Sequence, residues 1–194
     1  LEYAGTRVFI TGENDVSGFA EAISQGANII FMADDNRFIA FDSARAKIID
    51  NAEATGRGYV SALYHMAGGL KNKEVLVIGA GRVGISAIQF LQELNTHVRV
   101  YEKDENKLKF LDTAVKIENT LNEALPKYKY IVDATPAEGF LDIAHLHPEA
   151  MLACPGIPLG LSLKAKNRYK AQIIHDPLQI GVVTMLAMSL NTDF

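Results

Sequence analysis

The stretch VLVIGAGRVGISAIQFLQEL, residues 75–94, constrains the fold more than any other part of the chain. Its first four residues form an apolar, mostly β-branched run, which is typical of a parallel strand buried on both faces. Gly79, Gly81 and Gly84 follow with G-x-G-x-x-G spacing, and apolar residues then recur with the period of a helix. The stretch therefore predicts a buried strand, a glycine-rich turn and an amphipathic helix.

Dinucleotide-binding folds use glycines at this spacing for three physical reasons. Gly79 would allow the tight turn, Gly81 would let the backbone approach a pyrophosphate, and Gly84 would let helix and strand pack closely. The helix N-terminus would then face the phosphates and stabilise their negative charge. Glycine-rich turns also occur for packing reasons, so the spacing alone is weak evidence. The predicted cofactor contacts in this turn are Gly79, Ala80, Gly81, Arg82, Val83 and Gly84.

A second predicted strand, residues 97–102, ends in Glu102. An acid about twenty residues beyond the glycine turn commonly binds the adenosine ribose hydroxyls. Because a carboxylate repels a 2′-phosphate, Glu102 predicts NAD rather than NADP, although Lys103 could soften that preference. A solvated acid at a strand end is the alternative interpretation.

Strand and helix patterns alternate along the rest of the chain. Such alternation implies right-handed βαβ crossovers and a parallel sheet. We therefore predict an α/β protein with a Rossmann-type dinucleotide-binding domain and a smaller N-terminal α/β lobe. The predicted strands are residues 7–11, 28–35, 75–78, 97–102, 130–135 and 171–176, with 38–42 a further candidate, and the predicted helices are 15–27, 54–70, 82–94, 104–113, 163–169 and 178–190.

The predicted domains follow from these elements. Residues 1–69 would form the N-terminal substrate lobe with a connecting helix, and residues 70–176 the Rossmann NAD-binding domain. Residues 177–194 would return to the N-terminal lobe as a helix, because the first unit is too small to bury its own sheet. The apolar face of that helix comprises Ile180, Val183, Met185, Leu186 and Leu190.

Composition excludes several classes of protein. With 48% hydrophobic and 22% charged residues and a net charge of -4, the chain resembles a soluble globular protein without the basic surface that nucleic acid requires. No apolar run is long enough to span a membrane. A single cysteine, Cys154, excludes an internal disulfide and fits the cytoplasm. The chain begins at Leu1 on a strand-like segment, which is consistent with the back portion of a longer protein.

Two loops are expected at the carboxyl edge of the predicted sheet, where open α/β sheets bind ligands. They are DATPA, residues 133–137, and CPGIP, residues 154–158. Both would border the nicotinamide, although ordinary turn chemistry explains them equally well. The candidate contacts are Ala134, Thr135, Pro136, Pro155 and Gly156.

Carboxylates end two further predicted strands. Asp34 and Asp35 could bind a substrate ammonium or take a proton, and a capping or solvent-facing role is equally consistent. His175 and Asp176 stand together at another strand end, and we assign His175 no catalytic role.

Metal and thiol chemistry are not expected. His145 and His147 lack further ligand-type neighbours at metal spacing, and no motif makes Cys154 a nucleophile.

Six segments resemble, in the same order, motifs of the PylD dehydrogenases of pyrrolysine biosynthesis. They are DVSGFAEAISQGANIIFMADD, VLVIGAGRVG, VYE, DATP, PGIP and DPLQIG, and they extend over essentially the whole chain. The resemblance implies NAD-dependent oxidation of the terminal amine of L-lysine-Nε-3R-methyl-D-ornithine, followed by ring closure to pyrrolysine. By position it implies that the glycine turn and Glu102 hold NAD, and that Asp34, Asn51 and Asp176 contact substrate.

Residue chemistry agrees with an amine substrate. Asp34 and Asp176 could bind its ammonium groups, and one of them could accept a proton as the imine forms. We expect a small-molecule amine or amino-acid substrate and allow for a homodimer. A regulatory NAD-sensing Rossmann module without catalysis, a non-catalytic interaction domain and a related amino-acid dehydrogenase remain as alternatives.

Overall fold

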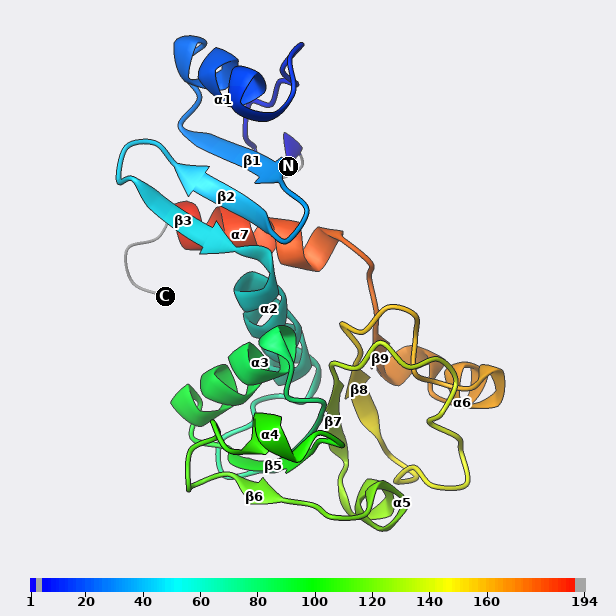
Figure 1. Ribbon diagram of the computed structural model, residues 1–194. Helices are drawn as coiled ribbons and strands as arrows, with labels where there is room; N and C mark the ends of the chain where they lie inside the picture. The colour runs from blue at the N-terminus through cyan, green and yellow to red at the C-terminus, as the bar shows by residue number, and fades with distance from the viewer. Residues whose placement is uncertain (3–4, 191–194) are drawn as a thin grey trace. The chain divides into compact units, whose positions relative to one another are not determined.

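A computed structural model describes residues 1–2 and 5–190. The described residues form two compact units, one within residues 1–55 and 178–190 and the other within residues 56–177 (Figure 1). The chain passes from the first unit to the second inside helix α2, Asn51–Met66, whereas the sequence analysis places the boundary after that helix. Within the described part of the chain, no helix is long and apolar enough to cross a membrane.

The second unit is built on a six-stranded sheet whose strand pairs are all parallel. The strand order is β6-β5-β4-β7-β8-β9, so the direction of winding reverses beside β4. This is the doubly wound Rossmann arrangement, and it confirms the predicted parallel sheet. The strands are β4 (Glu74–Ile78), β5 (His97–Tyr101), β6 (Lys116–Ile117), β7 (Tyr130–Asp133), β8 (Met151–Ala153) and β9 (Ile173–Ile174).

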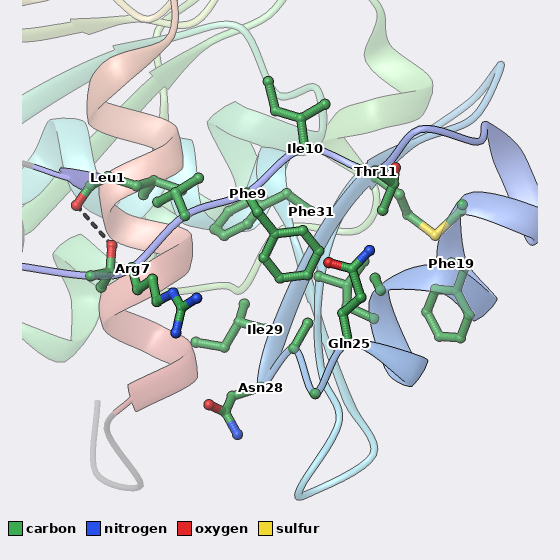
Figure 2. Close-up of a pocket in the computed structure, with 18 of the residues that line it drawn as sticks. Leu1, Arg7, Phe9, Ile10, Thr11, Phe19, Gln25, Asn28, Ile29 and Phe31 are labelled. Atoms are coloured by element: carbon green, nitrogen blue, oxygen red, sulfur yellow. Dashed lines mark hydrogen bonds between the residues drawn. The ribbon is translucent and has the colours of Figure 1, made fainter.

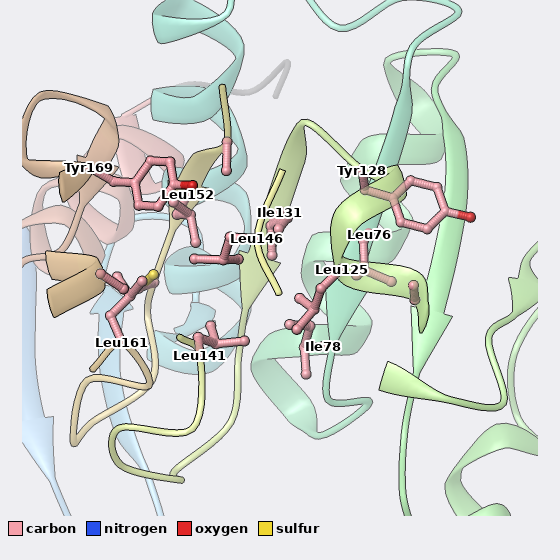
Figure 3. Close-up of a cluster of buried hydrophobic side chains, with 14 residues drawn as sticks. Leu76, Ile78, Leu125, Tyr128, Ile131, Leu141, Leu146, Leu152, Leu161 and Tyr169 are labelled. Atoms are coloured by element: carbon pink, nitrogen blue, oxygen red, sulfur yellow. The ribbon is translucent and has the colours of Figure 1, made fainter. Parts of the chain in front are cut away.

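Buried side chains from β4, β7 and β8 form the core on one face of this sheet. Figure 3 shows Leu76 and Ile78 of β4 near Ile131 of β7, with Leu152 and Tyr169 completing the cluster. Residues 75–78 are at most 1% exposed, as expected for a central strand. The helices of this unit are α3 (Arg82–Glu93), α4 (Glu105–Leu108), α5 (Leu121–Ala124), α6 (Leu163–Arg168), and the short 3-10 turns η2 (Leu125–Lys127) and η3 (Lys170–Gln172).

The first unit contains an antiparallel sheet. Strands β1 (Ile29–Ala33), β2 (Phe38–Asp42) and β3 (Lys47–Asp50) pair in chain order, with α1 (Asp15–Ser24) preceding them. Helix α7 (Gln179–Leu190) packs on β2 and β3 and buries Met185 and Met188 against Ala40 and Ile49. The last helix therefore supplies the apolar layer that the small sheet lacks.

Several predicted elements of the first unit were wrong. The predicted parallel crossover is absent there, because β1 and β2 are joined only by residues 34–37, which suffices for a hairpin and not for a parallel connection. Strand β3 was not predicted. Residues 7–11 form no strand. Ile10 of this segment is 93% exposed, so the segment does not bury its apolar side chains as a strand of a sheet would.

In the second unit, two elements are several residues shorter than predicted. The helix predicted at residues 104–113 is limited to α4, Glu105–Leu108. The apolar Phe110 beyond it is 83% exposed, so a further helical turn would bury no apolar side chain there to stabilise it. The strand predicted at 171–176 is limited to β9, whose partner β8 is itself short.

Candidate active site

The glycine turn between β4 and α3 has the backbone geometry that the sequence spacing predicts. Gly79 has a φ of +93°, in the left-handed region that favours glycine. A Cβ on Gly84 would lie 2.0 Å from the carbonyl oxygen of Gly79, so only glycine lets α3 approach the strand end. Both residues are thus explained by folding alone.

Gly81 has no such explanation within the folded chain. Its φ of -75° suits any residue, and a Cβ built on it would have no atom within 4 Å. It is the N-cap residue of α3 and has no side chain with which to cap that helix end. Open space over the residue in front of a helix N-terminus is what an approaching pyrophosphate needs, so the residues present fit a dinucleotide.

Glu102 follows β5 directly and turns back toward the glycine turn. Its Oε2 accepts a hydrogen bond of 2.7 Å from the N–H of Ala80, and its Oε1 one of 3.0 Å from the N–H of Asp104. The ammonium of Lys107 lies 3.9 Å from Oε2. Burial alone would raise the pKa of Glu102, but these two N–H groups and the lysine charge hold the pKa below its ordinary value. An ionised carboxylate therefore stands beside the turn.

Asp133 organises the loops at the carboxyl edge, and the sequence analysis did not select it. The side chain is fully buried at the end of β7, where its Oδ1 accepts bonds of 3.2 and 2.7 Å from the N–H and hydroxyl of Thr135. Its carbonyl accepts a bond from the N–H of Gly156, so it joins the two predicted loops. Its Oδ2 is buried without a partner among the described residues, and burial raises the pKa to about 6. A lone acid ending an otherwise apolar strand was the signal available in the sequence.

His175 is oriented by the chain after β8. Its Nδ1 lies 2.8 Å from the carbonyl oxygen of Cys154. Because a carbonyl only accepts hydrogen bonds, Nδ1 carries the hydrogen in this contact.

Asp176 is held by a tyrosine of α2 that the sequence analysis missed. The Tyr59 hydroxyl donates to the carbonyl oxygen of Asp176 at 2.5 Å, and the Asp176 N–H donates to that hydroxyl at 2.8 Å. Tyr59 is 1% exposed, and its sequence context is that of any buried helix residue. Only the structure could reveal this contact.

Asp34 and Asn51 belong to the first unit. Asp34 follows β1 in a hairpin turn, where its Oδ1 accepts bonds of 2.7 and 2.6 Å from the N–H groups of Asn36 and Arg37. These bonds lower the pKa of Asp34, so it is ionised at neutral pH. Asn51 begins α2, and its Oδ1 lies 3.5 Å from the Thr55 hydroxyl. Asp34 thus follows a strand of an antiparallel sheet. The rule that ligands bind at the carboxyl ends of strands applies to parallel α/β sheets, so it does not support a substrate role for Asp34.

The comparisons with known sequences decide the family. Residues 1–49 match the family described as pyrrolysine biosynthesis protein PylD, N-terminal domain, and residues 48–183 match alanine dehydrogenase/PNT, C-terminal domain. The chain is 35% identical over 188 residues to a pyrrolysine synthase of Methanosarcina barkeri, covering 95% of this chain and 70% of that protein. The chain belongs to the pyrrolysine synthase family. A pyrrolysine synthase of Methanosarcina acetivorans is 33% identical over 187 residues, covering 95% of this chain and 71% of that one.

Solved structures show the same fold in more distant enzymes. A shikimate dehydrogenase from Aquifex aeolicus aligns with a TM-score of 0.66 at 17% identity, covering 97% of this chain and 82% of that one. A quinate dehydrogenase from Corynebacterium glutamicum, solved in complex with NAD, aligns with a TM-score of 0.60 at 14% identity, covering 92% and 77%. At these identities the likeness concerns the fold alone.

The two family matches cover different parts of the chain. The part that matches PylD alone, residues 1–47, contains α1, β1 and β2 and reaches only the first residue of β3. A groove of about 1180 Å³ lies in the first unit, between residues 6–11, α1 and β1, and Leu186 and Leu190 of α7 complete its lining (Figure 2). Its lining combines the apolar Phe9 and Phe31 with the polar Gln25, and it does not include Asp34 or Asn51.

The described residues contain no cluster of three or more side chains able to hold a metal ion. Cys154 is a buried free thiol, and burial together with the Asp133 charge raises its pKa.

Proposed function

We propose that this chain oxidises the terminal amine of L-lysine-Nε-3R-methyl-D-ornithine to an imine with NAD, and that a second amine of the product attacks the imine carbon and displaces ammonia, which closes the ring of pyrrolysine. By family and fold the chain is an NAD-dependent dehydrogenase of pyrrolysine biosynthesis. The observation that carries the proposal is the open space at Gly81 beside the ionised Glu102, in a chain whose first 49 residues match PylD.

In this proposal the second unit holds the cofactor. The N–H groups at the start of α3 would face the pyrophosphate, and the Glu102 carboxylate would accept hydrogen bonds from the ribose hydroxyls. The loops at residues 134–136 and 155–156 would contact the nicotinamide half, because they follow β7 and β8 at the carboxyl edge. When bound, NAD supplies the acceptor for the hydride.

Asp34, Asn51 and Asp176 would bind the substrate. The substrate enters with ammonium groups, and carboxylates bind these best in their ionised form. Hydride can leave the carbon next to nitrogen only after the ammonium has lost a proton, because the nitrogen lone pair must form the C=N bond. One of the two aspartates would accept that proton, while the hydride passes to NAD.

Two other functions make different predictions. An NAD-sensing module would bind NAD without turnover, and a related amino-acid dehydrogenase would reduce NAD with a simpler amino acid. The PylD match of residues 1–49 favours the pyrrolysine precursor over both. We also propose that the protein is cytoplasmic, because its one cysteine is a buried free thiol. Its assembly as a homodimer stays a prediction.

The test begins with Gly81→Ala. The added methyl meets no protein atom within 4 Å, so the fold should be unchanged while the pyrophosphate loses its closest approach. Calorimetry should show NAD binding weakened at least about tenfold, or about 1.4 kcal/mol. Binding equal to the parent would overturn the assignment of the cofactor site.

Substrate identity is tested separately. Adding the lysine–methylornithine precursor and NAD to the parent protein should produce NADH, and lysine or alanine alone should not. NADH formation from a simple amino acid instead would favour the related dehydrogenase, and no NADH with either would favour the sensing module.

A further inference from the structure

The backbone of Asp176 needs an anchor that its own strand does not provide. Strand β9 ends at Ile174, two residues earlier, and the chain leaves the unit after Pro177. Proline has no N–H, so the residue after Asp176 cannot donate a backbone hydrogen bond. A contact from helix α2 holds the Asp176 backbone in addition to its local contacts.

The Tyr59 hydroxyl supplies such an anchor. It uses its one hydrogen on the carbonyl oxygen of Asp176 and accepts the N–H of the same residue. A hydroxyl can donate once and accept as well, so both backbone groups of Asp176 are satisfied by one atom. Tyr59 is buried in the continuous helix α2, and burial raises its pKa, so the hydroxyl keeps its hydrogen.

We infer that Tyr59 is a positioning residue for amine oxidation: it fixes the Asp176 backbone, and through it the direction in which the carboxylate is presented. The inference rests on the proposed substrate role of Asp176. Tyr59 touches neither substrate nor cofactor in this account, and acts only through Asp176. Fixing a reacting or binding group in advance matters because small displacements reduce turnover steeply.

The experiment compares three single variants of the protein and one double variant. Tyr59→Phe keeps the ring and removes both hydrogen bonds. Tyr169→Phe is the matched control, because Tyr169 is also 1% exposed and its hydroxyl also donates to a backbone carbonyl, that of His147, at 3.0 Å. Asp176→Asn tests the group on which Tyr59 is proposed to act.

We expect Tyr59→Phe to lower kcat/KM for the amine substrate about ten- to hundredfold, with the Kd for NAD unchanged. The thermal midpoints of Tyr59→Phe and Tyr169→Phe should fall by similar amounts, while Tyr169→Phe keeps parental kcat/KM. Adding Tyr59→Phe to Asp176→Asn should cause little further loss, since both changes act on one group.

The outcomes distinguish the proposed substrate role of Asp176 from the positioning role of Tyr59. If Asp176→Asn retains parental turnover, the proposed role of Asp176 fails. If Asp176→Asn is impaired and Tyr59→Phe turns over like the parent, the positioning role alone is overturned. Equal kinetic losses in Tyr59→Phe and Tyr169→Phe would also overturn it, because the effect would then be one of stability.

Discussion

Asp133 should make the stability of the protein fall as pH rises through the weakly acidic range. The carboxyl is fully buried, and its Oδ2 has no partner among the described residues. Burial is the main reason that its pKa rises to about 6, and the bonds from Thr135 and the charge of His175 offset only part of that effect. The folded protein therefore holds this proton more tightly than the unfolded chain does.

The sign and size follow from linkage. Below pH about 4 the carboxyl is protonated in both states, since an unfolded aspartate has a pKa of about 3.9. As pH rises from about 4 to about 6, the unfolded chain loses the proton first, so the free energy of unfolding decreases, and above that range the loss is complete. The difference between about 3.9 and about 6 corresponds to about 3 kcal/mol at about 1.4 kcal/mol per pKa unit.

Asp133→Asn isolates this contribution, because asparagine keeps an oxygen for Thr135 and does not ionise. Urea unfolding should show the free-energy difference between variant and parent shifting in favour of the variant by about 2 kcal/mol between pH 4 and pH 7.5. Asp142→Asn is the control: bonds from Ser162 and Ala144 lower the pKa of Asp142, so any shift there should have the opposite sign. A difference for Asp133→Asn that is constant with pH would refute the reasoning.

Four further substitutions test the cofactor acid, the packing of the glycine turn and the hairpin turn of the first unit. Glu102→Ala should weaken NAD binding and reduce the preference for NAD over NADP, as measured by calorimetry with both cofactors; equal affinities in the parent would contradict the assignment. Gly84→Ala should destabilise the protein by about 1–3 kcal/mol in urea unfolding, because its Cβ would lie 2.0 Å from a backbone oxygen, and parental stability would contradict that packing. Asp34→Asn keeps an oxygen for the turn and removes the charge, so turnover should fall at parental stability. A variant Asp34→Ala should also lose stability, and unchanged turnover in both would leave Asp34 a turn residue only.

The second unit could be predicted from sequence because its signals are local. Residues 75–78 are apolar on both faces, and a strand of that kind needs neighbours on both sides and helices above and below. The positive φ of Gly79 and the close approach at Gly84 are likewise backbone requirements that a single residue type satisfies. The parallel sheet and the glycine geometry were therefore both predictable, whereas the strand order comes from the structure.

The first unit was harder to predict because its pattern depends on distant partners. Residues 7–11 have strand-like composition, yet they form no strand, since pairing and not propensity decides a strand. The sheet that does form relies on α7, which lies at the other end of the chain. The contacts of Asp133 and Tyr59 were missed for a related reason: each joins segments far apart in sequence through polar atoms that leave no periodic signal.

Comparing the three glycines separates folding from binding in a way that the motif cannot. Gly79 and Gly84 are required by the folded chain itself, so they would be needed even in a protein that binds nothing. Gly81 satisfies no such requirement, because its φ is ordinary and the space over it is open. A glycine that the fold does not need is best explained by a ligand that needs the space, which is why Gly81→Ala is the sharpest test of the NAD site.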